Sequence, residues 1–269
     1  MTETQPNYFS GSFYPADPVT LQRFIEKNLT PPLTDHAPLA LVVPHAGYVY
    51  SGKTALHAFS QAASYSYQRI ILLGPAHRSY HQGLALSSAD STETPLGNLP
   101  NDKKIALELT DNLFKLNTSA FIQEHSLEVQ LPFLKYLFPH TPILPIIVGE
   151  LTPPEAAQAG AKLQPLVLDN SLLVISSDLS HYHPLTLAKQ IDTRTINSLL
   201  RLSASQFWND HLQKNIECCG IFPLLLALNI LQEIPALQAE LIHYQTSADA
   251  SLDSKQVVGY AAIQFFKED

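Results

Sequence analysis

Three histidines follow short apolar runs, at positions where their side chains could meet and bind a metal ion or move protons. Each run is followed within a few residues by one of them: 39–43 by His45, 69–73 by His77, and 171–175 by His181. Such runs are typical of strands buried on both faces, and open α/β sheets bind ligands at the carboxyl ends of their strands. If the three strands are neighbours, the imidazoles converge; otherwise each histidine only caps a strand or bonds a loop carbonyl.

A thiol is the fourth candidate, because Cys218 and Cys219 open an apolar helix expected over 219–232. A helix N-terminus favours the thiolate, which is the form that binds metals. Adjacent side chains point in different directions, so we expect only one thiol to enter the site. The alternative is that both are small buried residues, the usual role of free cysteine. Neighbouring cysteines cannot form an ordinary long-range disulfide, which fits a reducing compartment.

Two further pairs of polar residues stand close to these positions. His125 and Glu128 are three residues apart at the start of a helix expected over 125–138, hence on one helix face. They either pair in or beside the site or form a solvated helix start. Asp178 stands three residues before His181 and is expected to fix the tautomer of that histidine or to accept a bond from a substrate.

Composition and missing motifs exclude several classes of function. Of the 269 residues, 45% are hydrophobic and 15% are charged, and the net charge is −8. Without a cluster of lysine and arginine, neither nucleic acid nor an anionic membrane is an expected partner. The apolar runs are too short to span a membrane, and the first residues lack the features of a signal peptide, so a cytoplasmic location is expected. The sequence has no GxGxxG, Walker, HExxH or GxSxG motif.

The order of apolar runs and helical stretches predicts the fold class. Four apolar runs predict strands: 39–43, 69–73, 143–148 and 171–175. Between them, helices are expected near 101–116, 125–138 and 154–167. Strands alternating with helices predict an α/β fold with a mostly parallel central sheet, helices on both faces and the site at the C-terminal ends of the strands. The runs 241–244 and 257–266 read as two further strands, added antiparallel. No linker or repeat interrupts the chain, so residues 1–269 are expected to form a single domain.

Several motifs, in the same order along the chain, resemble those of the Memo family, which is called AmmeMemoRadiSam system protein B in bacteria and archaea. They are VPHAGY at 43–48, LGPAH at 73–77, EHSLEVQLPF at 124–133, SDLSHY at 177–182 and the Cys219-Gly220 helix start. The resemblance covers nearly the whole chain. It implies a fold similar to that of class III extradiol dioxygenases, which are non-haem Fe(II) enzymes.

The resemblance also implies roles for individual residues. The positions that match the family's metal ligands are His45, His77 and Cys219. Three more polar residues are expected in the same cleft, with roles in catalysis: His181, Asp178 and His125. Fe(II) is the expected metal. A cysteine where the dioxygenases have a glutamate ligand softens the site, which leaves copper or zinc as alternatives.

Two classes of function therefore follow from the sequence. The first is a metal-binding redox or dioxygenase-like enzyme with a His/His/Cys site. The alternative is a non-catalytic binding or adaptor module that uses the same cleft for a (phospho)peptide or a partner protein. The family name adds an expected link to AMMECR1-like and radical SAM proteins. Nothing in the sequence identifies a substrate, whether a small molecule or a peptide.

Overall fold

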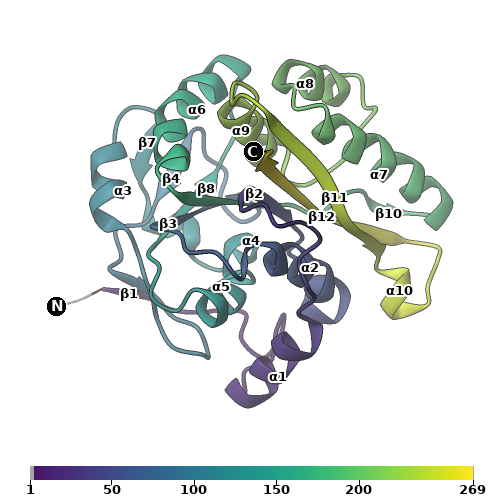
Figure 1. Cartoon of the computed structure of the whole chain (residues 1–269), viewed down its shortest axis with the longest axis horizontal. Coiled ribbons are helices and arrows are strands. Elements are labelled where there is room, and N and C mark those ends of the chain that lie inside the picture. Colours follow the sequence, from purple (N-terminus) through teal and green to yellow (C-terminus); the bar gives the residue numbers. More distant parts are fainter. Residues whose placement is uncertain (1–2, 269) are drawn as a thin grey trace.

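A computed structural model of the chain describes residues 3–268, which fold around a central nine-stranded sheet (Figure 1). The strands of this sheet are β2 (Pro38–Val43), β3 (Arg69–Pro75), β4 (Leu84–Leu86), β7 (Phe114–Leu116), β8 (Ile143–Val148), β9 (Ser171–Ser176), β10 (His181–His183), β11 (Leu237–Thr246) and β12 (Val257–Lys267). Their order is β10-β12-β2-β9-β3-β8-β4-β7, with β11 paired to β12. A small separate sheet contains β1 (Thr4–Gln5), β5 (Ser91–Thr92) and β6 (Leu99–Pro100).

The centre of the large sheet is parallel and its margins are mixed. Strands β2, β9, β3 and β8 run parallel to one another. Strands β11 and β12 are antiparallel additions, as expected, and β4 also pairs antiparallel with β8. The short loop between β3 and β4 explains the reversal at β4, because antiparallel strands need no crossover helix. The predicted central sheet is confirmed, with more antiparallel pairing at its margins than expected.

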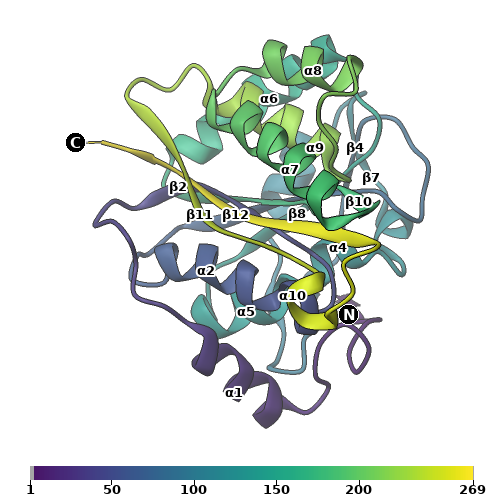
Figure 2. The same cartoon turned by 90° about the vertical axis from the view of Figure 1, so that its right-hand side faces the viewer.

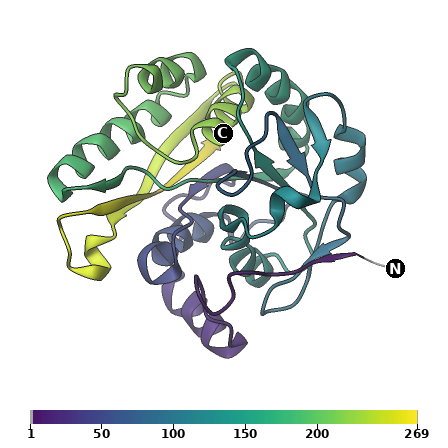
Figure 3. The ribbon, with the colours of Figure 1, turned by 180° about the vertical axis from the view of Figure 1, so that it is seen from behind.

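Helices cover both faces of the sheet (Figures 1 and 2). One face packs against α6 (Pro153–Leu168), α7 (Leu185–Leu200), α8 (Ala204–Leu212) and α9 (Ile221–Leu231). The other packs against α1 (Pro18–Asn28), α2 (Lys53–Ala62), α4 (His125–Glu128) and α5 (Leu131–Leu137). The view from behind shows the same two layers of helices with the sheet between them (Figure 3). The remaining helices are α3 (Lys103–Leu109), α10 (Ala248–Ser251), the π-helix η1 (Tyr48–Gly52) and the 3-10 helix η2 (Thr118–Phe121).

Strand β2 shows why the central strands are continuously apolar. Ala40 and Val42 belong to the core beneath α6 to α9, whereas Leu41 and Val43 belong to the core beneath α1, α2 and α5. Successive side chains of a strand point to opposite faces, so a strand covered on both sides has no polar position. This arrangement leaves the loops after the strands as the place for polar chemistry.

Two predicted helices differ from the structure. The helix expected over 101–116 ends at Leu109, and the Asp111 side chain then accepts backbone N–H bonds from Leu113 and Phe114 in a turn that leads into β7. The helix expected over 125–138 is two short helices, α4 and α5. Pro132 lies in the first turn of α5, and proline has no N–H to continue the preceding helix.

Helix α9 is the most apolar helix and packs against both α6 and α8. All but two of its eleven residues are buried, and it begins directly after Gly220. It therefore places the cysteine pair at the edge of the core. Within residues 3–268, none of the helices combines the length and the apolar character needed to cross a membrane.

Candidate metal centre

The loops that carry the candidate residues leave one edge of the sheet side by side. Strands β2, β9 and β3 are consecutive neighbours in the sheet. His45, Asp178 and His77 each stand two residues past the end of one of these strands. The condition under which the imidazoles were predicted to converge is therefore met for His45 and His77.

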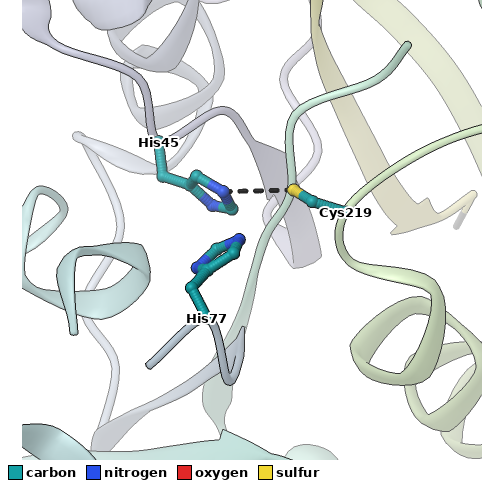
Figure 4. A group of neighbouring side chains, drawn as sticks. All are labelled: His45, His77 and Cys219. Carbon is teal, nitrogen blue, oxygen red and sulfur yellow. Dashed lines mark hydrogen bonds between the residues drawn. The ribbon is translucent and has the colours of Figure 1, made fainter. Parts of the chain in front are cut away.

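His45, His77 and Cys219 form a compact group of metal-binding atoms. One nitrogen of each imidazole and the thiol sulfur all lie within 4.8 Å of one another. The Nε2 atom of His45 is 3.1 Å from the Cys219 sulfur, and the two imidazole planes cross at 79°. Figure 4 shows the two rings and the sulfur directed toward one common point. Ligand atoms around a tetrahedral zinc ion are roughly 3.5 Å apart, so small movements suffice for these three to share an ion.

The tautomer of His45 follows from its partner at the end of β9. Ser176 Oγ donates its only proton to the Ser126 carbonyl, 2.6 Å away. The 2.9 Å bond between Ser176 Oγ and His45 Nδ1 must therefore be donated by the imidazole. With its proton on Nδ1, His45 directs the Nε2 lone pair toward the thiol. Burial also lowers the pKa of His45 well below its usual value, so the ring is neutral.

His77 is oriented by a buried carboxylate. Glu124 Oε1 lies 2.9 Å from His77 Nδ1, and Glu124 Oε2 accepts the backbone N–H groups of His77 and Arg78. These bonds, with that from the Ser126 amide, outweigh burial and lower the pKa of Glu124 to about 2. An ionised carboxylate can only accept, so His77 carries its proton on Nδ1 and leaves Nε2 free to bind a metal. Glu124 was not predicted as a site residue.

Cys219 is held in place by contacts on both sides. The backbone N–H of Asp178 donates to its sulfur over 3.2 Å. Gly220 follows, and a side chain there would have its Cβ only 2.5 Å from the Ser177 Cβ, so the chain passes β9 more closely than any other residue allows. Burial, followed by the nearby Asp178 charge, raises the pKa of the Cys219 thiol well above its usual value. The expected thiolate is therefore disfavoured in the metal-free protein, because burial outweighs the effect of the helix end.

The second cysteine takes no part in the metal-binding group. Cys218 is buried in the core beneath α6 to α9, and burial raises the pKa of its thiol to about 12. Only Cys219 faces the two histidines, in keeping with the expectation that a single thiol enters the site. Cys218 has the inert, apolar role that free cysteines usually have.

Asp178 and His181 lie near the group but do not pair with each other. Asp178 Oδ1 accepts the backbone N–H of His45 over 2.8 Å, and burial raises the pKa of this carboxyl to about 7. The backbone N–H of His181 donates to Glu217, and burial lowers the pKa of the His181 ring. Of the contacts described for residues 3–268, none joins the Asp178 carboxylate to the His181 ring. The expected control of the His181 tautomer by Asp178 is therefore absent, because that carboxylate holds the His45 loop.

His125 packs directly against the two histidines of the group. Its ring stacks on His77 with centroids 4.6 Å apart and meets the His45 ring edge-on at 5.3 Å. Burial, together with the neighbouring His77, lowers the pKa of His125 to about 4. Its neutral ring thus forms a wall of the site.

The expected pairing of His125 with Glu128 is wrong. Glu128 accepts bonds from the backbone of Tyr8 and Phe9 and from the hydroxyl of Tyr14, so it anchors the N-terminal segment instead. Helix α4 has only one turn, and the carboxylate nearest to the His125 ring is that of Glu124, with 3.6 Å between Oε1 and Nδ1. His77, Glu124 and His125 could also hold an ion. The four bonds that Glu124 accepts favour an orienting role.

A pocket of about 440 Å³ opens beside the group. His77 and Cys219 form part of its wall, and the loops after β3 and β8 form most of the remainder. Its volume falls in the range of sites for small molecules. Its lining residues are Pro75, Ala76, His77, Arg78, Ser79, Tyr80, His81, Val148, Gly149, Glu150, Cys219 and Phe222.

Fold and site together define an α/β protein with a His/His/Cys cluster at the carboxyl edge of its parallel strands. The family model for Memo-like proteins matches residues 6–264. A MEMO1 family protein of Methanosarcina barkeri is 34% identical over 262 residues, which are 94% of this chain and 97% of that protein. One of Aquifex aeolicus is 34% identical over 264 residues, covering 95% and 97%. The chain therefore belongs to the Memo family.

A solved structure supports the fold. The crystal structure of an uncharacterized protein from Escherichia coli superposes with a TM-score of 0.56 at 14% sequence identity. The match covers 83% of this chain and 98% of that protein. At this level of identity the likeness concerns the fold alone.

Proposed function

We propose that this Memo-family protein binds a divalent metal, with iron as the first candidate, through His45, His77 and Cys219, and acts as a redox enzyme on a small substrate. The observation that carries the proposal is the convergence of the three ligand atoms within 4.8 Å. Ser176 and Glu124 further support it, because their hydrogen bonds leave both Nε2 lone pairs free. Two neutral imidazoles and one thiolate leave a divalent ion with one net positive charge and positions for other ligands.

The surrounding residues suit proton transfer next to such an ion. When bound, the metal would supply redox or Lewis-acid chemistry to a substrate in the adjoining pocket. The carboxyl of Asp178, with a pKa raised to about 7, can hold or release a proton near neutral pH. His181 has a pKa lowered by burial and is a neutral acceptor under the same conditions. His125 excludes water from one side of the two ligand rings.

Elemental analysis of three proteins tests the metal site. The native protein, Cys219→Ser and the matched control Cys218→Ser are purified anaerobically, without chelators or nickel affinity resin. We expect near-stoichiometric metal in the native protein and in Cys218→Ser, and at least a tenfold loss in Cys219→Ser. Equal metal content in the two serine variants would refute the assignment of Cys219 as a ligand.

The same preparations separate the enzyme from the alternative function. If the native protein takes up no metal after reconstitution with Fe(II), Cu or Zn, the cleft is better explained as a binding module for a peptide or a partner protein. AMMECR1-like and radical SAM proteins are then the first partners to test. If metal is bound, His181→Ala is expected to retain it and to lose turnover, measured as O₂ uptake in a screen of diols.

A further inference from the structure

Arg78 follows the ligand His77 and brings a positive charge to the pocket. Its backbone is held in place, because its N–H donates to the buried Glu124 over 3.2 Å. Its side chain is exposed and lines the same pocket as His77 and Cys219. Ion pairs within residues 3–268 involve Arg69 and Arg201, but not Arg78. A guanidinium without a carboxylate partner is thus available to a ligand.

The charges around Arg78 leave it as the main attraction for an anion. Arg78 lines the pocket together with His77 and Cys219, which places its charge close to the site. The carboxylate of Glu124 is already bound to His77 and backbone amides. Glu150 also lines the pocket and accepts a bond of 2.9 Å from the Tyr80 hydroxyl. In a chain with a net charge of −8, the positive charge of Arg78 is a local exception to the overall acidity.

The pocket lining contains three kinds of group. The metal-binding group contributes His77 and Cys219 to the wall. Apolar side chains line the walls, among them Val148 and Phe222. Arg78 supplies the cation. A ligand that satisfies all three kinds has a donor for the metal, an apolar body and one negative group.

We infer that the substrate of this site is a small carboxylic acid, whose carboxylate is held by Arg78 while its other end reaches the metal-binding group. A planar guanidinium binds a carboxylate through two parallel hydrogen bonds, which fixes orientation as well as position. One guanidinium in a pocket that also contains the Glu150 carboxylate favours a singly charged group over a doubly charged phosphate. This inference rests on the proposed function, because the metal end of the ligand requires the His/His/Cys site.

Calorimetric titration with two matched ligands tests the inference. The probes are 3,4-dihydroxybenzoate and 3,4-dihydroxybenzamide, which have nearly the same shape and differ by one charge. We expect the metal-loaded native protein to bind the acid at least tenfold more tightly than the amide. In Arg78→Gln this preference should fall to about twofold or less, and in Glu150→Gln it should increase. Arg194→Gln, whose side chain lies on α7 and bonds the Asn215 carbonyl, is the control and should keep the native preference.

Each outcome bears on the inference. Equal binding of acid and amide by the loaded native protein, an unchanged preference in Arg78→Gln, or no binding of either probe would overturn it, whatever the metal content. A preference for the acid that depends on Arg78 but is identical in metal-loaded protein and in Cys219→Ser would support recognition by Arg78. That same result would contradict the proposed function, so the two failures are distinguishable.

Discussion

Two hydrogen bonds decide which nitrogen of each candidate ligand faces the thiol. Ser176 fixes the tautomer of His45 and Glu124 fixes that of His77, and both acceptors are themselves buried. The chain thus has the metal-binding faces of both imidazoles arranged before any ion arrives. Partners of this kind commonly contribute about 10–100-fold to metal affinity.

Glu124→Gln is predicted to weaken metal binding by about 10–100-fold. The two oxygens of Glu124 accept four bonds, from His77 Nδ1–H and from three backbone N–H groups. The glutamine amide has only one oxygen and cannot accept them all, so the His77 ring loses its fixed orientation. Competition for Zn²⁺ with a chromophoric chelator measures the change. Glu108→Gln, on the exposed face of α3, serves as the control and should retain native affinity. Native affinity in Glu124→Gln would show that Glu124 does not position the ligand.

At the scale of elements, α2 and β11 meet through a pair of histidines that do not belong to the metal-binding group. The rings of His57 and His243 stack 4.2 Å apart, and His243 Nδ1 bonds Thr54 Oγ1 over 3.1 Å. Burial lowers the pKa of both rings. The charge of His57 lowers that of His243 further, and the pKa of His243 is about 4. Lys53 acts in the same direction on both, whereas Asp249 raises the pKa of His243. The folded contact therefore requires neutral imidazoles.

This contact is predicted to make the fold acid-sensitive. The pKa of His243 is lower in the folded than in the unfolded chain, so the unfolded chain binds more protons as pH falls below about 6.5. Stability is therefore lost between about pH 6.5 and 4, by about 1 kcal/mol at pH 5 after allowance for the half-exposed ring. Urea unfolding at pH 7.5 and 5 should show a smaller loss for His243→Asn than for the native protein. His140→Asn, at an exposed position, should behave as native.

At the scale of the whole molecule, the ligands join segments that are far apart in the chain. His45 follows β2 and His77 follows β3, whereas Cys219 precedes α9. Helix α9 lies in the core on one face of the sheet, whereas β2 and β3 have residues in the cores on both faces. On the second face, β3 contacts α4. An ion at this point cross-links the fold and should stabilise it against unfolding.

Metal binding is predicted to raise the melting temperature. At a free Zn²⁺ concentration of about 100 times Kd, the stabilisation is about 2.7 kcal/mol. For a chain of this size that corresponds to a rise in Tm of roughly 5–10 °C. Differential scanning calorimetry should show the rise in the native protein and in Cys218→Ser. The same rise in Cys219→Ser would mean that the ion binds elsewhere among the histidines.

The central strands, and the positions of His45 and His77 just after two of them, could be predicted from the sequence alone. Residues buried on both faces of a sheet must be apolar throughout, so 39–43, 69–73, 143–148 and 171–175 stand out from the sequence. A helix interrupted by Pro132 and a turn at Asp111 were harder to predict, because local packing decides where a short helix ends. The position of the cysteine pair at a helix start made a thiol a candidate, and the family motifs selected Cys219 as the ligand.

The partners of those residues depend on how distant segments come together in the folded chain. That β2, β9 and β3 are neighbours is a property of sheet order, which distant pairings establish. Glu124 and Glu128 look alike in the sequence, yet Glu124, at the start of α4, bonds His77, whereas Glu128, at its end, bonds Tyr14. Burial likewise raised the pKa of Cys219 where the helix end alone predicted a lowered one. Solvent access and hydrogen-bond partners arise between segments, so they are fixed only when the chain folds.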